Sequence, residues 1–226
     1  MRPVAGSLLS FLDDAARARI LGIGVRRSFG ANELLHREGD PSTHVLILTS
    51  GWVRVSTSSR DGREILLALR GPGDVLGELA ALHGWPRSAS VSTVEPATVV
   101  QFTGPQFVSA VNLDRNFSMA VIRTTAVRLR DAEGARVDSA TLDVGKRVAS
   151  WLLRLTIAHG ERAADGIHIR MPLSQEDIAN RVGASRRAVA RSLALLRERG
   201  IVRTARRSII VIDPGVLRAL ADCGPH

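Results

Sequence analysis

Several polar residues in the segment LGELAALHGWPRSASV have the types and spacing of an anion-binding site. Gly77 lets the backbone approach a ligand closely, and a helix that begins at Glu78 and Leu79 would turn its free N–H groups toward a negative charge. Arg87 and Ser88 would add a charged donor and a hydroxyl donor. The alternative is structural: Gly77 forms a turn, and Glu78 and Arg87 form an ion pair.

Basic residues are concentrated in a second segment, near the C-terminus. Residues 111–226 carry 20 basic and 12 acidic side chains, whereas the first half of the chain is nearly neutral. Within residues 181–207 there are nine arginines and one acidic residue, Glu198. Such a concentration is typical of a nucleic-acid-binding face, with a solvated charged helix as the alternative.

The basic segment has the pattern of two short helices joined by a glycine turn. Ser174 and Asp177 have capping-box spacing, Gly183 suits the end of the first helix, and Ser185 suits the cap of the second. The apolar residues predicted to face inward are Ile178, Ala179, Val182, Val189, Leu193 and Leu196. This order of elements predicts a helix-turn-helix.

Three arginines are expected on the outer face of the second helix, Arg186, Arg187 and Arg191. Arginine binds guanine O6 and N7 with two hydrogen bonds, which contributes about 1–3 kcal/mol of base discrimination. A hairpin over Ile201–Ile212 follows, and the sequence predicts a wing on the DNA phosphates with three arginines at its tip. These are Arg203, Arg206 and Arg207.

The preceding part of the chain provides the elements that must position these residues. Residues 25–103 alternate strand-like runs with Gly, Pro and Asp turns, which predicts an antiparallel barrel or jelly roll, with one helix over residues 7–22 before it. Residues 144–158 predict a helix with Val148, Leu152, Leu155 and Ile157 near one side, then a loop, HGERAADG, and a short strand, IHIRM.

Residues 115–138 are expected to form a long helix. Its apolar stripe would contain Phe117, Val121, Ile122, Ala126 and Leu129, with Gly134 interrupting it. A stripe of this kind packs on a partner helix or on the protein's own barrel.

Composition excludes several classes of site. The one cysteine, Cys223, rules out an intramolecular disulfide, a cysteine-ligated zinc and an iron–sulfur cluster. The histidines are scattered, and His83 as a haem ligand is the weaker alternative to a surface residue. No apolar run reaches the length of a membrane span and no signal peptide is recognisable, so we expect a cytoplasmic protein without a membrane partner.

Two motifs, GDVLGELAAL followed by PRSAS and then LSQEDIANRVGASRRAVARSL, resemble the Crp/Fnr family of bacterial regulators along nearly the whole chain. The resemblance implies an α+β fold: an N-terminal antiparallel β-roll like that of cyclic-nucleotide-binding jelly rolls, a long dimerisation helix and a C-terminal winged helix-turn-helix. The expected boundaries are 1–114 for the ligand-sensing roll, 115–142 for the helix and 143–226 for the DNA-binding domain.

The resemblance also assigns roles in a ligand site. Backbone N–H groups at Gly77–Leu79 would face a cyclic phosphate, Glu78 would accept a hydrogen bond from the ribose 2′-hydroxyl, and Arg87 with Ser88 would bind the phosphate. The family's purine contacts fall on Ala132 and Glu133, which leaves recognition of the base open.

In the DNA-binding domain, the resemblance makes Arg186 and Arg191 base-reading residues. Arg187 replaces a glutamate of the family's founding cAMP receptor. Arginine cannot accept a hydrogen bond, so the preferred half-site should differ at that base.

We therefore expect a homodimeric, sequence-specific transcription regulator that binds a palindromic site in double-stranded DNA, with RNA polymerase as a candidate partner. The expected effector is a cyclic nucleotide such as cAMP, without a metal or covalent cofactor. The alternatives are a regulator of this fold that needs no nucleotide or responds to another effector, an enzyme acting on cyclic nucleotides, and a non-specific architectural DNA binder.

Overall fold

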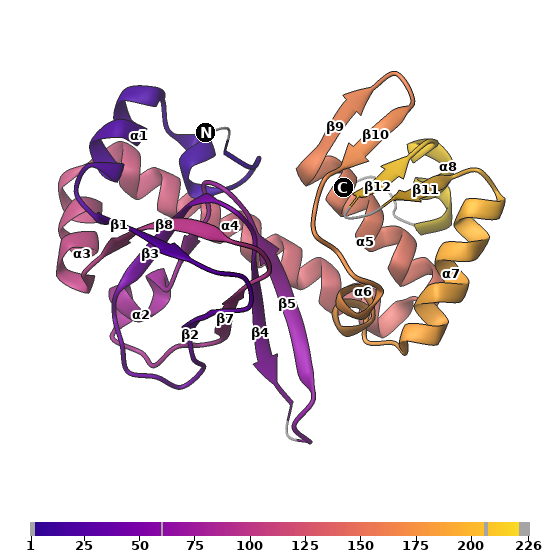
Figure 1. Cartoon of the computed structure of the whole chain (residues 1–226), viewed down its shortest axis with the longest axis horizontal. Coiled ribbons are helices and arrows are strands. Elements are labelled where there is room, and N and C mark those ends of the chain that lie inside the picture. Colours follow the sequence, from indigo (N-terminus) through magenta and orange to yellow (C-terminus); the bar gives the residue numbers. More distant parts are fainter. Residues whose placement is uncertain (1–2, 60, 206–207, 222–226) are drawn as a thin grey trace. The chain divides into compact units, whose positions relative to one another are not determined.

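The computed structural model describes residues 3–59, 61–205 and 208–221 (Figure 1). The chain divides into two compact units, Met1–Leu129 and Arg130–His226. The division falls inside one helix, α4 (Arg115–Thr141), so no loop separates the units.

The first unit is built around two antiparallel sheets of four strands each (Figure 1). One sheet has the order β1 (Val25–Phe29), β8 (Ala97–Phe102), β3 (Val45–Ser50), β6 (Val75–Leu76). The other has the order β2 (Leu34–His36), β7 (Ser90–Thr93), β4 (Val53–Ser58), β5 (Glu64–Arg70). The predicted antiparallel β-roll is confirmed.

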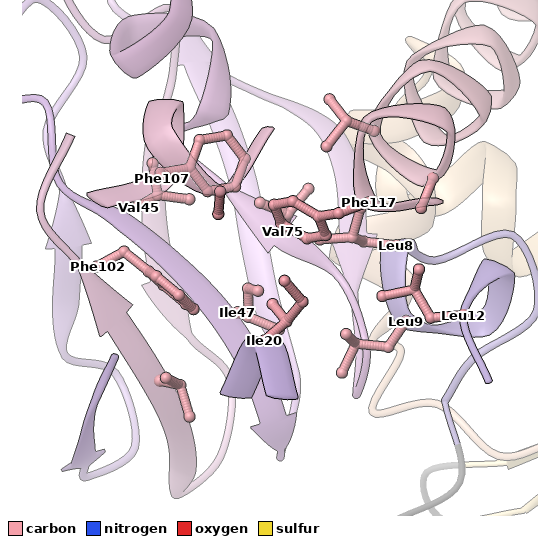
Figure 2. Close-up of a cluster of buried hydrophobic side chains, with 14 of the residues drawn as sticks. Leu8, Leu9, Leu12, Ile20, Val45, Ile47, Val75, Phe102, Phe107 and Phe117 are labelled. Atoms are coloured by element: carbon pink, nitrogen blue, oxygen red, sulfur yellow. The ribbon is translucent and has the colours of Figure 1, made fainter. Parts of the chain in front are cut away.

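Helical segments that precede and follow the strands in the sequence complete the main core of the roll. Phe107 and Phe117 pack edge to face with ring centroids 5.6 Å apart, and the side chains of Leu8, Leu9 and Phe102 belong to the same buried cluster (Figure 2). Phe107 comes from α3 (Gly104–Leu113) and Phe117 from α4. Burial of these large side chains fixes the start of α4 on the roll.

The N-terminal segment differs from the single helix expected over residues 7–22. It forms a 3-10 turn, Leu8–Phe11, and a separate helix, α1 (Asp14–Leu21). Asp13 divides them because its side chain accepts a hydrogen bond from the Ala16 N–H, a capping role that its short carboxylate performs better than a helix-interior one.

Helix α4 differs from its sequence pattern in two ways. It continues through Gly134, since a single glycine costs only about 1 kcal/mol in a helix of this length. Its apolar residues also fall on two faces. Phe117 and Val121 are buried in the roll, whereas the side chains of Ile122 and Leu129 are 58% and 59% exposed.

The second unit contains α5 (Val144–His159), α6 (Gln175–Val182), α7 (Arg186–Glu198), α8 (Pro214–Ala221) and a sheet of order β11 (Val202–Ala205), β12 (Ser208–Val211), β10 (Gly166–Ile169), β9 (Gly160–Ala163). The prediction of a loop at HGERAADG is wrong, because residues of this segment form β9, which pairs with β10 in a hairpin. Residues of β9 are mostly exposed, so this edge strand lacks the apolar alternation that would identify it. Ile157, expected on the inner side of α5, is 70% exposed.

Candidate functional site

Gly77 precedes the short helix α2 (Glu78–His83) and adopts a left-handed backbone conformation, with φ at 82°. A Cβ atom at this position would lie 2.1 Å from Nη1 of Arg87 and 3.0 Å from the carbonyl oxygen of His44. A side chain at Gly77 would therefore be strained and would also displace the guanidinium.

Arg87 is held by the segment before β3 as well as by Gly77. Its Nη1 donates to the Gly77 carbonyl (3.0 Å), Nη2 to the His44 carbonyl (2.6 Å) and Nε to Ser42 Oγ (3.1 Å). The Arg87 backbone also pairs with this segment, since its N–H donates to the Asp40 carbonyl and its carbonyl accepts from the Gly39 N–H. We call this arrangement of residues 39–44, 77–79 and 87–88 the cradle.

The Arg87 guanidinium is buried without a direct ionic partner. The residue is 3% exposed, and among the described residues no carboxylate oxygen lies within 4 Å of it. Burial lowers the pKa of Arg87, while the more distant charges of Glu78 and Asp40 act in the opposite direction. A buried cation that meets only neutral acceptors is electrostatically suited to an incoming anion.

Glu78 pairs with Arg128 of α4 rather than with Arg87. Nη1 of Arg128 donates to Glu78 Oε1 (2.9 Å), and Nη2 donates to Asp74 Oδ1 (3.2 Å) and to the Val75 carbonyl (2.7 Å). Although burial opposes the charge, the two carboxylates raise the pKa of Arg128. The Glu78–Arg87 ion pair considered from the sequence is therefore wrong, and Glu78 is connected to the long helix instead.

The remaining residues predicted for the ligand site are accessible at the surface. Leu79 is 37% exposed and Ser88 is exposed beside the buried Arg87. Ala132 and Glu133 are both exposed on α4. Thr124, a hydroxyl earlier on α4, is buried and donates to the Ala120 carbonyl, so it is not available as a base contact.

An exposed aromatic pair follows α2. The rings of His83 and Trp85 stack with centroids 4.5 Å apart, and Trp85 is 60% exposed. His83 is therefore an exposed residue whose ring stacks on that of Trp85. In the part of the chain that the structure describes, no group of three or more His, Cys, Asp or Glu side chains is arranged to hold a metal ion.

Three members of this network, Ser42, His44 and Arg128, were not among the residues predicted from the sequence. Ser42 and His44 lie more than 40 residues before Arg87 and contact it through a hydroxyl and a backbone carbonyl. A carbonyl contact leaves no trace in residue type. Arg128 is one of 30 arginines, and only the fold distinguishes it from the others on α4.

The helix-turn-helix has the predicted caps. Ser174 and Asp177 form a complete capping box at the start of α6, Gly183 ends that helix at φ 63°, and Ser185 accepts from the Ala188 N–H at the start of α7. The predicted inner residues are all buried: Ile178, Ala179, Val182, Val189, Leu193 and Leu196.

The arginines predicted to read DNA lie on the opposite face. Arg186, Arg187 and Arg191 are exposed, and none of them forms a salt bridge within the described chain. The charge of this face is therefore free for an external polyanion.

The predicted wing is the β11–β12 hairpin. Arg206 and Arg207 lie outside the described residues. Arg203 was expected at the tip of the hairpin. It lies instead within β11, where it forms a salt bridge with Asp165. This surface ion pair joins β11 to the turn between β9 and β10.

Arg147 of α5 connects the helix-turn-helix to the end of α4. Its Nη1 donates to the Leu142 carbonyl (2.7 Å) and its Nε to the Val182 carbonyl at the end of α6 (2.8 Å). One guanidinium thus satisfies carbonyl groups at two helix ends.

Comparisons with known proteins identify both units. Residues 26–114 match the model of the cyclic nucleotide-binding domain, and residues 146–220 match that of the Crp-like helix-turn-helix domain. The chain is 32% identical over 185 residues to a CRP-like cAMP-activated global transcriptional regulator of Mycobacterium tuberculosis, covering 82% of this chain and 83% of that protein. The chain belongs to the Crp/Fnr family. Crp/Fnr proteins are DNA-binding transcription regulators, so this chain is a regulator and not an enzyme.

Other Crp/Fnr relatives have different regulatory roles. The global nitrogen regulator of a Nostoc species is 31% identical over 195 residues, covering 85% of this chain and 87% of that protein. Among solved structures, FixK2 from Bradyrhizobium japonicum has a TM-score of 0.78 at 24% identity, covering 89% of this chain and 99% of that one, and shows the common fold. A CRP-family transcriptional regulator from Thermus thermophilus has a TM-score of 0.69 at 27% identity, covering 87% of this chain and 97% of that one.

Membership in the Crp/Fnr family confirms the predicted fold class and the regulatory function. Among the described helices, none is long and apolar enough to cross a bilayer.

Proposed function

We propose that this protein is a homodimeric transcription regulator whose affinity for a palindromic DNA site is controlled by a cyclic nucleotide, cAMP in the first instance, bound in the cradle. The observation that carries the proposal is the buried Arg87 guanidinium, which meets three neutral acceptors and no carboxylate. A relative 32% identical to this chain is described as cAMP-activated, which supports this choice of nucleotide.

The cradle provides complementary groups for the two halves of a ribose cyclic phosphate. Arg87, with the exposed Ser88 beside it, would bind the phosphate oxygens through charge-assisted and hydroxyl hydrogen bonds. Glu78 would share its carboxylate between Arg128 and a ligand hydroxyl. A ligand bound there would act on α4 through Arg128. It would shift the equilibrium between the state that binds DNA and the state that does not only to the extent that it binds the first more tightly than the second.

The contacts to the base are the least defined part of this site. Ala132 offers no hydrogen bond, and Glu133 places an exposed carboxylate on α4. These substitutions favour the second candidate, a regulator that responds to a different effector or to none. Such a protein would bind its DNA site equally with and without cAMP.

The exposed apolar residues of α4 support the homodimer. Met119, Ile122 and Leu129 are 41%, 58% and 59% exposed, and they follow one another at spacings of three and seven residues along the helix. This spacing fits one face of a helix, which makes the surface suitable for a second α4.

Replacing Arg87 by alanine should weaken cAMP binding by about a hundredfold or more. Each charge-assisted hydrogen bond contributes about 1.5–3 kcal/mol, and two such bonds correspond to that factor. Isothermal titration of cAMP into the wild type and Arg87→Ala measures the change. Arg37→Ala, which removes an exposed arginine of the same domain, is the matched control and should bind normally. Equal affinity in Arg87→Ala and the wild type would refute the assigned phosphate site.

Two exposed arginines at the ends of α7, its first residue Arg186 and its C-cap residue Arg199, give a test of DNA recognition. Arg186→Ala should cost about 1–3 kcal/mol on the preferred site and much less on unrelated duplex, because a base contact is lost as well as a charge. Arg199→Ala removes an exposed arginine at the other end of the helix and should weaken both duplexes equally. Fluorescence anisotropy on a site selected from random duplexes, at one fixed salt concentration, measures both. An equal loss on both duplexes for Arg186→Ala would favour the architectural alternative.

A further inference from the structure

Two histidines lie near Arg87 in the first unit, one buried and one partly buried. The rings of His36, in β2, and His44, just before β3, have centroids 4.7 Å apart. His36 is 3% exposed, and neither of its ring nitrogens makes a well-formed hydrogen bond, although the Leu76 carbonyl lies near enough to interact with the ring. His44 is only partly buried, and its backbone carbonyl accepts the hydrogen bond from Arg87.

The cluster contains three basic side chains and lacks a direct acidic partner among the described residues. The nearby carboxylates are occupied or more distant: Glu78 pairs with Arg128, and Asp40 acts on Arg87 only through longer-range electrostatics. One positive charge is already present on Arg87, so protonation of a second group here is unfavourable until an anion arrives.

The charges around the two rings affect them unequally. Burial first, then the Arg87 charge and His44, lower the pKa of His36 to about 3, and the Leu76 carbonyl offsets this only in part. Burial and the Arg87 charge also lower the pKa of His44. Because His44 is less buried than His36, its imidazole is the one more readily protonated once an anion offsets the Arg87 charge.

We propose that His44 belongs to the effector site as a proton-binding group, so that the phosphate of the effector is bound together with one proton. The anion would offset the repulsion from Arg87, and the His44 imidazole would then carry a second positive charge near that of Arg87. His36 would stay neutral, because it is the more deeply buried of the two rings. The inference rests on the proposed function, since it requires an anion in the cradle.

The sign of the pH dependence follows from this linkage. The effector raises the pKa of His44 relative to the free protein, so affinity is highest below the free-state pKa and falls as pH rises through the bound-state pKa. The phosphodiester of cAMP remains a single negative charge throughout pH 6–8, so cAMP itself contributes no titration there.

The test is isothermal titration of cAMP into the full-length protein at pH 6, 7 and 8, in buffers of different ionisation enthalpy. We expect cAMP affinity to fall about tenfold from pH 6 to pH 8, with uptake of up to one proton per bound nucleotide. His44→Gln should remove both effects, while its backbone carbonyl still binds Arg87. His83→Gln, which changes the exposed stacked histidine, should keep both.

The outcomes separate the two proposals. Wild-type affinity that is constant across this pH range, without proton uptake, would overturn the role of His44 while leaving cAMP binding intact. Proton uptake that persists unchanged in His44→Gln would also overturn it. Absence of binding for both cAMP and cGMP at all three pH values would remove the proposed function itself, and the present inference with it.

Discussion

Replacing Gly77 by alanine should weaken effector binding strongly while leaving a folded protein. The new Cβ would lie 2.1 Å from Nη1 of Arg87, so the guanidinium must leave its position against the Gly77 and His44 carbonyls. Two charge-assisted hydrogen bonds to the phosphate are then lost, which we expect to raise the dissociation constant of cAMP by about a hundredfold or more.

Gly84 is the matched control for this substitution. It lies at the other end of α2, also has a positive φ, 70°, and has no atom within 4 Å of a Cβ added there. Both alanine variants incur the left-handed backbone penalty of about 1–2 kcal/mol, but only Gly77→Ala displaces Arg87. Titration with cAMP and urea unfolding of both variants separate the two effects. Similar cAMP affinity in the two variants would show that Arg87 does not bind the effector where the structure places it.

Removing Arg128 should produce the largest loss of stability among the substitutions considered. Arg128→Met leaves Glu78 and Asp74, which are 7% and 5% exposed, as two buried carboxylates without their cation. Breaking one side of a buried ion pair costs about 3–5 kcal/mol. We expect a decrease of this size in the free energy of unfolding of the first unit, measured by urea titration.

The control for this experiment is Arg130→Met, two residues further along α4, where the arginine is exposed. Its substitution should change stability by less than about 1 kcal/mol. If both variants unfold at the same urea concentration, the network of Arg128 with Glu78 and Asp74 does not stabilise the protein, and its proposed role in communicating with α4 loses its support.

The helix-turn-helix was predictable from the sequence because its information is local. A cap and its acceptor are three residues apart, and Gly183 marks the turn through its own backbone preference. The buried and exposed faces of α7 likewise follow from helical periodicity within one segment. Neighbouring residues determine each of these features.

The cradle was predictable only in part because its contacts are long-range. Gly77 and Arg87 belong to one short motif, whereas Ser42, His44 and Arg128 reach the site from other parts of the roll and from α4. The apolar pattern of α4 was misleading for a related reason. Periodicity placed Phe117 and Ile122 in one stripe, but only the position of the roll determines that the first is buried and the second exposed.

The stack of Trp85 on His83 gives the protein a built-in optical probe. The chain has three tryptophans, and Trp151 is buried, whereas Trp85 is 60% exposed and lies two residues before Arg87. Its indole emission therefore depends on solvent access and on the imidazole stacked against it, and we expect both to change when a ligand fills the neighbouring cradle. Occupancy of the proposed effector site should therefore be measurable by intrinsic fluorescence without a dye, with Trp85→Phe as the blank.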